Sequence, residues 1–218
     1  LIVQKALTKV LKSKIKVIGA GRTDSGVHAK GQSANFPFNQ KIKDKHKFLN
    51  SVNFFLKNKS VSITNIKKKN KNIHARFSVK KKIYKYIILN RQTTSPIYEN
   101  RAWLIKNKLD LNLMKSGAKF FLGTHNFSSM RASSCSSKNP VRTLTKAEIK
   151  KKGEQIIIIF ESKSFLQKQV RSMVGCLKYV GEKKWKPEKI KYLINLKKRD
   201  LCAPPAPPCG LYLEKVFY

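Results

Sequence analysis

The chain has 218 residues, and 41% of them are hydrophobic, which is enough for the core of one large domain or of two smaller halves. Lysine and arginine number 48 against 11 aspartates and glutamates, and the formal net charge of +37 favours a polyanionic partner, for which nucleic acid is the natural candidate. No stretch reaches the roughly 20 apolar residues of a membrane span, and none resembles a signal peptide, so we expect a cytoplasmic protein without membrane attachment.

The first 72 residues predict an α/β half. Hydrophobic side chains at helical spacing predict a helix over residues 1–11, and the β-branched run at residues 15–18 predicts a strand that leads into a loop. Beyond this loop, the apolar face of residues 47–56 predicts a second helix. Alternation over residues 60–66 predicts the strand that closes this half.

The loop after residues 15–18 has three glycines and presents one arginine and one aspartate, Arg22 and Asp24. Glycine allows the close backbone approach that suits a large ligand. The glycine spacing fits neither the dinucleotide fingerprint nor a P-loop. Because carboxylates are scarce in this chain, Asp24 is a candidate for chemistry. The alternative is that Asp24 or Thr23 caps a helix or forms a turn.

The second half covers residues 73–218 and begins with a predicted strand at residues 80–90. Asp110 is placed to cap a helix over residues 111–122, and the serine-rich segment 128–140 has the composition of an exposed loop. The remaining chain predicts a hairpin of two strands at residues 143–150 and 155–160, followed by helices at 165–180 and 187–196. A proline-rich stretch without regular structure at 204–208 then leads to a final strand at 211–216. The order of elements in two comparable halves favours an α+β fold.

The cysteines and histidines carry no signature of a metal site. The cysteines stand at positions 135, 176, 202 and 209, without a C-x-x-C pair. The four histidines do not lie at zinc-type intervals beside them. We therefore expect no metal and no disulfide.

Two tyrosines of the strand at residues 80–90, Tyr84 and Tyr86, share one face because side chains alternate along a strand. An aromatic ring suits the holding of a base that has been extracted from its stack. Either tyrosine could do this, and both could instead be core residues.

Arg171 lies between Val170 and Val174 on an otherwise apolar predicted helix. A cation on a buried face needs an anion, and with so few acids in the chain Asp24 is a good candidate. Such a partner favours the ionised form of the carboxylate. The alternative is that Arg171 points to solvent or to an RNA phosphate.

Three segments carry a family resemblance. Residues 21–29, GRTDSGVHA, resemble the signature loop of the tRNA pseudouridine synthase A family, which more often has alanine where Ser25 stands. Residues 74–78, HARFS, with the nearby YKY at 84–86 resemble the second motif of the family. Residues 165–175, FLQKQVRSMVG, resemble the third motif. The three motifs occur in the family's order, and the resemblance covers nearly the whole chain.

The resemblance implies a pseudouridine synthase fold, in which two similar α/β halves form a continuous, mainly antiparallel sheet flanked by helices in one catalytic domain over residues 1–218. It implies that Asp24 is the catalytic nucleophile and that Arg171 pairs with it. It further implies that Arg22 helps to extrude the target base and replaces it in the RNA, and that Tyr84 stacks on that base. The family has a strand before the helix at residues 1–11, so we expect the chain to be truncated at its N-terminus.

The activity that the resemblance implies is that of an isomerase, which needs no cofactor and converts uridines 38, 39 and 40 in the anticodon arm of tRNA to pseudouridine. It also implies a homodimer. The chain offers one obvious carboxylate where glycosidases usually use two, which favours isomerisation over hydrolysis. The alternative is a basic RNA-binding protein without catalysis, for which charge and aromatic residues suffice. The proximity of Asp24 to Arg171 distinguishes the two.

Overall fold

The computed structural model describes residues 2–218, which form two compact units. The first unit consists of residues 2–21 and Ser33–Ser78, and the second of Arg22–Gln32 and Val79–Tyr218. The segment Arg22–Gln32 therefore belongs to the second unit, although in sequence it interrupts the first.

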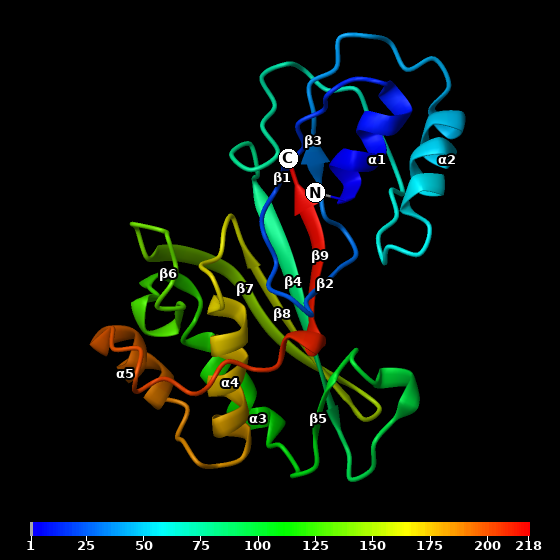
Figure 1. Ribbon diagram of the computed structural model, residues 1–218. Coiled ribbons are helices and arrows are strands. Elements are labelled where there is room, and N and C mark those ends of the chain that lie inside the picture. Colours follow the sequence, from blue (N-terminus) through cyan, green and yellow to red (C-terminus); the bar gives the residue numbers. More distant parts are fainter. Residues whose placement is uncertain (1) are drawn as a thin grey trace. The chain divides into compact units, whose positions relative to one another are not determined.

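The first unit contains two helices and a two-stranded antiparallel sheet: α1 (Ile2–Leu11), α2 (Lys45–Leu56), β1 (Ile18–Gly19) and β3 (Ala34–Asn35) (Figure 1). The Asp44 carboxylate caps α2 by accepting a hydrogen bond from the Lys47 N–H at 2.9 Å. Buried side chains from both helices and the segment between them form the core of this unit: Ala6, Leu7, Ile15, Phe48, Val52 and Leu56. The predicted division of the chain into halves at residues 72 and 73 stays a prediction.

The strand predicted at residues 15–18 is almost absent. The Ile15 N–H donates to the Thr8 hydroxyl at 3.3 Å, and the Val17 N–H donates to the Gln4 side-chain oxygen at 3.2 Å. Both acceptors lie on α1, so helix side chains satisfy backbone groups that a strand neighbour would otherwise pair. Strand β1 is reduced to two residues.

The strand predicted at residues 60–66 is wrong, because that segment has no strand in the structure. The reason lies on α2, where the side-chain amide of Asn53 makes two hydrogen bonds with the backbone of Ile63. Its oxygen accepts from the Ile63 N–H at 2.7 Å, and its nitrogen donates to the Ile63 carbonyl at 2.9 Å. An asparagine thus takes the place of a neighbouring strand.

The second unit contains a seven-stranded sheet in which β2, β9, β4, β8, β7 and β6 follow one another, with β5 also paired to β4. The strands are β2 (His28–Ala29), β4 (Lys81–Asn90), β5 (Trp103–Ile105), β6 (Gly123–Asn126), β7 (Val141–Lys152), β8 (Gln155–Ser162) and β9 (Leu211–Phe217). The β2–β9 and β4–β5 pairs are parallel, and the others are antiparallel. Among the described residues, β1 and β3 form a separate sheet, so the predicted continuity of one sheet is not seen.

Three helices of the second unit, α3 (Leu111–Lys119), α4 (Gln169–Gly181) and α5 (Lys189–Leu196), lie on one face of this sheet (Figure 1). Helix α4 is central, and its Met173, Val174 and Leu177 are fully buried. These helices and the sheet confirm the predicted mixed fold, with a multi-stranded, mainly antiparallel sheet flanked by helices. Within residues 2–218, none of the helices combines the length and the apolar character of a membrane span.

The ends of these helices show which local predictions are correct. The Asp110 carboxylate accepts from the N–H groups of Asn112 and Leu113, which confirms it as the cap of α3. Helix α4 begins four residues later than predicted, because Lys168 has a φ of +62° and the preceding segment forms a turn. The Gln169 side chain supports this turn by accepting from the Leu166 N–H at 2.8 Å.

Three short 3₁₀ helices complete the second unit: η1 (Pro96–Tyr98), η2 (Ser128–Met130) and η3 (Pro208–Gly210). The prediction that residues 128–140 form an exposed loop is wrong at its start, where Ser129 and Met130 are fully buried in η2. Serine-rich composition predicts exposure, but the apolar residues beside these serines are buried in the core, and the short helix is buried with them.

Candidate active site

The Asp24 loop, which we define as residues 22–27, belongs to the second unit and leads into strand β2. A hydrogen bond from the Val27 N–H to the Asp24 carbonyl at 3.1 Å closes its turn. Gly26 has a φ of +78° in this turn, and a Cβ atom there would lie 3.0 Å from Pro208 Cγ. Glycine therefore allows the turn to lie directly against η3.

Strand β2 fixes the far end of the Asp24 loop. It pairs with β9 so that His28 lies opposite Tyr212, and the two rings stack with their centroids 4.6 Å apart. The His28 Nε2–H donates to the Asn100 carbonyl at 2.9 Å. The Tyr212 hydroxyl donates to the Arg101 carbonyl at 2.6 Å. The segment between β4 and β5 is thereby tied to the Asp24 loop.

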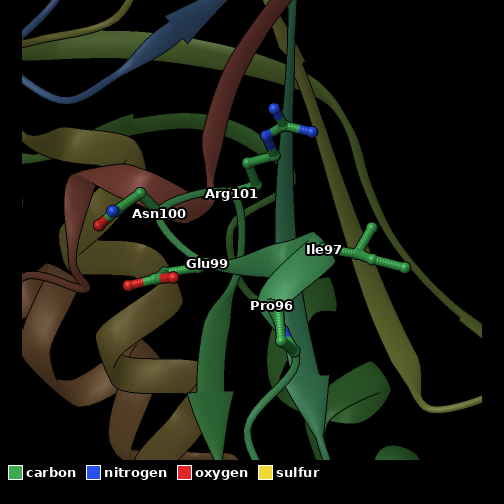
Figure 2. A pocket seen from close by; sticks show the side chains of 5 residues that line it. All are labelled: Pro96, Ile97, Glu99, Asn100 and Arg101. Atoms are coloured by element: carbon green, nitrogen blue, oxygen red, sulfur yellow. The ribbon is translucent and has the colours of Figure 1, made fainter.

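A hollow of about 530 Å³ lies on the segment between β4 and β5. It is lined by Pro96, Ile97, Glu99, Asn100 and Arg101. Figure 2 shows that these side chains diverge, with Glu99 and Asn100 on one side and Ile97 on the other. Catalysis requires groups that converge on a reacting atom. The hollow lacks such an arrangement, and Asp24 remains the candidate for chemistry.

Asp24 and Arg171 form an ion pair. The Arg171 Nη1 donates to Asp24 Oδ2 at 2.7 Å, and its Nε donates to the Ala206 carbonyl at 2.7 Å. The side chains are 14% exposed for Arg171 and 25% exposed for Asp24. The predicted pairing is therefore confirmed, and the alternative that Arg171 points to solvent is wrong. The pair joins positions 147 residues apart in the chain.

The proline segment, which we define as residues 203–210, holds Arg171 in place. Its Ala206 bonds to Arg171 twice, since the Ala206 N–H also donates to the Arg171 carbonyl at 2.9 Å. Further along α4, Gly175 lies against Pro204, and a Cβ atom on Gly175 would be 2.1 Å from the Pro204 carbonyl oxygen. This close approach of helix and proline segment is possible only because residue 175 has no side chain.

We expect Gly175→Ala to lower the free energy of unfolding by about 2–4 kcal/mol, because α4 and the proline segment must separate to admit the methyl group. Any activity that depends on the ion pair should fall with it, since Arg171 then loses its alignment. Urea unfolding followed by circular dichroism measures the first effect. Gly19→Ala is the control, because its Cβ would come no nearer than 3.9 Å to the Gly21 carbonyl oxygen. Equal stability of both variants would contradict the expectation.

The structure distinguishes the two tyrosines of β4. Tyr86 is fully buried, its hydroxyl donates to the Pro207 carbonyl at 2.7 Å, and burial raises its pKa. Tyr84 is half-buried and meets the Phe165 ring edge-on at 5.1 Å. Burial, together with the negative charge of Asp24, raises the pKa of Tyr84 to about 12, so its phenol is neutral at physiological pH. Tyr86 is a core residue, whereas Tyr84 is only partly buried and senses the charge of Asp24.

The remaining predicted site residue, Arg22, lies two positions before Asp24 and is exposed. The structure therefore brings Asp24 and Arg171 together, places Tyr84 where it senses the charge of Asp24, and leaves Arg22 on the surface of the Asp24 loop. Within residues 2–218, His, Cys, Asp and Glu side chains form no group of three that could hold a metal ion.

The chain is similar to known pseudouridine synthases. A family model described as tRNA pseudouridine synthase matches residues 118–218. The tRNA pseudouridine synthase A of Pelagibacter ubique is 51% identical over 216 residues, which cover 99% of this chain and 88% of that protein. The proteins of the same name from Neorickettsia sennetsu and Ehrlichia canis are 39% and 40% identical, over 99% and 100% of this chain and 88% of each relative. The chain belongs to the tRNA pseudouridine synthase A family.

Membership in the tRNA pseudouridine synthase A family makes the chain an isomerase with a pseudouridine synthase fold. Sequence reasoning found the charged pair of this site but missed the Ala206 carbonyl that binds Arg171. It also missed Phe165, whose ring borders Tyr84. The one signal that could have pointed to Ala206 is its place between prolines, where the carbonyls have no regular partners and remain free to accept side-chain donors.

Proposed function

We propose that this chain converts uridines 38, 39 and 40 in the anticodon arm of tRNA to pseudouridine, with Asp24 as the nucleophile. The observation that carries the proposal is the ion pair of Asp24 with Arg171, which joins positions 147 residues apart in the chain. The net charge of +37 supports an RNA substrate. The relatives named above support tRNA as the class of RNA.

The reaction breaks the N1–C1′ bond of uridine and joins C1′ to C5 of the same uracil. The hydrogen on C5 leaves as a proton and N1 gains a proton, so no electrons are exchanged with another molecule and the step requires no redox cofactor. A carboxylate promotes it by attacking C1′, as in glycoside chemistry, or by adding to C6 of the base. Arg171 engages Oδ2, so we propose Oδ1 of Asp24 as the attacking atom.

Arg171 contributes to this chemistry through Asp24. Its Nη1 donates to Asp24 Oδ2 at 2.7 Å and holds the carboxylate in one orientation, with Oδ1 left for attack. Its second hydrogen bond, to the Ala206 carbonyl, fixes the direction from which the guanidinium approaches. The nucleophile is thereby oriented before the substrate arrives, which lowers the entropic cost of reaching the transition state.

We propose that Tyr84 and Arg22 act on the target base and on the position that it leaves in the RNA. A target uridine must leave the stacked anticodon arm to reach Asp24, and an aromatic ring stabilises the extruded base. We propose that Tyr84 supplies this ring. The exposed Arg22 is then suited to occupy the vacated position in the RNA through contacts with phosphates and base edges.

Tyr84→Leu should reduce kcat/KM for tRNA by roughly 10- to 100-fold, because stacking on an aromatic ring contributes about 1–3 kcal/mol per base. Tyr84→Phe keeps the ring and should retain activity within about threefold. The measurement is pseudouridine formation under single-turnover conditions. The matched control is Tyr192→Leu, on the exposed surface of α5, which should leave the rate unchanged. A Tyr84→Leu enzyme as fast as the wild type would show that stacking occurs elsewhere.

The proposed function is tested by incubating the enzyme with an unmodified tRNA transcript and mapping pseudouridine at every uridine. We expect modification at positions 38, 39 and 40 wherever these are uridines, and none in a transcript that carries cytidine there. Modification confined to other positions would contradict the specificity. Tight binding without any pseudouridine would favour the alternative, a basic RNA-binding protein without catalysis. We also propose that the enzyme works in the cytoplasm as a homodimer, which light scattering of the purified protein tests.

A further inference from the structure

Two cysteine sulfurs lie close together outside the active site. Cys176 is buried on α4, and Cys202 is half-buried in the segment after α5. Their Sγ atoms are 3.4 Å apart, and both residues are free thiols. A disulfide bond requires about 2.05 Å between the sulfurs, so an approach of roughly 1.4 Å would join them.

The two thiols differ in their tendency to ionise. A hydrogen bond from the Cys176 thiol lowers the pKa of Cys202, and the positive charge of Arg199 lowers it further. The same hydrogen bond, together with burial, raises the pKa of Cys176. Burial also raises the pKa of Cys209, whose sulfur lies 3.6 Å from the Ala102 carbonyl. Cys202 is therefore the thiol that is favoured to react, with Cys176 beside it as a partner.

We propose that Cys202 and Cys176 form an oxidisable dithiol, which a peroxide converts to an intramolecular disulfide. The Cys202 thiolate attacks one peroxide oxygen, the O–O bond breaks, and Cys202 becomes a sulfenic acid as hydroxide leaves. The Cys176 sulfur then attacks the Cys202 sulfur, the S–OH bond breaks, and the Cys176 proton leaves with the hydroxide as water. The two thiols are oxidised by two electrons, which reduce the peroxide.

The cross-link would join two elements that hold Arg171, α4 and the proline segment. Cys202 directly precedes the proline segment, whose Ala206 makes both hydrogen bonds to Arg171. Cys176 follows Gly175, where α4 lies directly against Pro204 of the proline segment. A disulfide between them fastens the proline segment to α4 covalently. This inference does not depend on the proposed RNA chemistry, because it concerns the thiols alone.

The experiment oxidises the full chain with hydrogen peroxide, blocks the remaining thiols with N-ethylmaleimide and maps the tryptic peptides. Trypsin releases residues 172–178 with Cys176 and residues 200–215 with both Cys202 and Cys209. A Cys209→Ser background makes the assignment to Cys202 unique. We expect the two peptides to be linked, with a mass two hydrogens below their sum, and to separate after treatment with dithiothreitol.

Two controls keep the proposal falsifiable even if one variant folds poorly. In the reduced wild type, iodoacetamide should alkylate Cys202 at least about tenfold faster than Cys135 or Cys209. Cys202→Ser should prevent the linked peptide, whereas Cys135→Ser should not. The proposal is overturned if the peptides remain separate after exhaustive peroxide treatment, if the link involves Cys135, or if Cys202 is alkylated no faster than Cys209.

Discussion

Asp24→Asn is expected to lower kcat/KM for pseudouridine formation by at least about 10³-fold, because it removes the proposed nucleophile while preserving the size of the side chain. The fold should survive. The asparagine oxygen can still accept from Arg171, so we expect the free energy of unfolding to fall by only about 1–2 kcal/mol. Release of tritium from tRNA labelled at C5 of uridine measures the reaction, since that hydrogen leaves when the C5–C1′ bond forms.

The matched control is Asp110→Asn, which changes the cap of α3 by the same chemistry outside the site. It should lower stability slightly and leave the rate of tritium release within about twofold. An Asp24→Asn enzyme that retains a tenth of the wild-type rate would show that another group carries out the chemistry. Binding of tRNA by Asp24→Asn should remain close to that of the wild type, because a carboxylate contributes no attraction to phosphate.

Arg171→Lys is expected to reduce kcat by about 10²-fold or more while keeping the positive charge. Arginine reaches the Asp24 carboxylate through Nη1 and the Ala206 carbonyl through Nε, whereas a single ammonium cannot reproduce this fork. We expect a loss of about 1–3 kcal/mol in the free energy of unfolding, since both partners are largely buried. Urea unfolding and single-turnover kinetics on the same preparation separate the two effects.

Arg91→Lys provides the control for Arg171→Lys. Arg91 also bonds to a carboxylate and to a carbonyl, those of Glu154 and Thr93, but it lies away from the Asp24 loop. Its replacement should leave kcat unchanged. A double-mutant cycle with Arg171→Met and Asp24→Asn should show strong coupling in rate. Independent, additive effects of the two substitutions would contradict a functional pair.

The elements that the sequence predicted correctly are those determined by neighbouring residues. The Asp110 cap of α3 is local, because the side chain bonds to backbone groups two and three positions later. The hairpin of β7 and β8 is also local, turning at Gly153 with a φ of +57°. The strand predicted at residues 60–66 failed because Asn53, ten positions before Ile63, satisfies that backbone. Alternating hydrophobicity indicates which side chains are buried, but it does not indicate which groups make hydrogen bonds with the backbone.

The candidate site could be predicted in part. The pairing of Asp24 with Arg171 could be predicted because a buried cation requires an anion and the chain has few acids. The choice between Tyr84 and Tyr86 required the structure, since both lie on one face of β4 and differ only in what covers them. Contacts made by backbone carbonyls, such as that of Ala206, have no residue type to mark them. The neighbouring prolines mark the Ala206 carbonyl as one without a regular partner, but only the fold shows that Arg171 is its donor.

The contacts that hold the Asp24 loop can form only late in the synthesis of the chain. The loop is synthesised early, but it is held by η3 and by β9, whose residues 208–217 emerge from the ribosome nearly two hundred codons later. Until these residues emerge, β2 lacks its strand partner and the turn at Gly26 lacks the proline ring against which it lies. A nascent chain therefore carries the proposed nucleophile before the parts of the fold that hold its loop have been made, and we expect activity to depend on synthesis of β9.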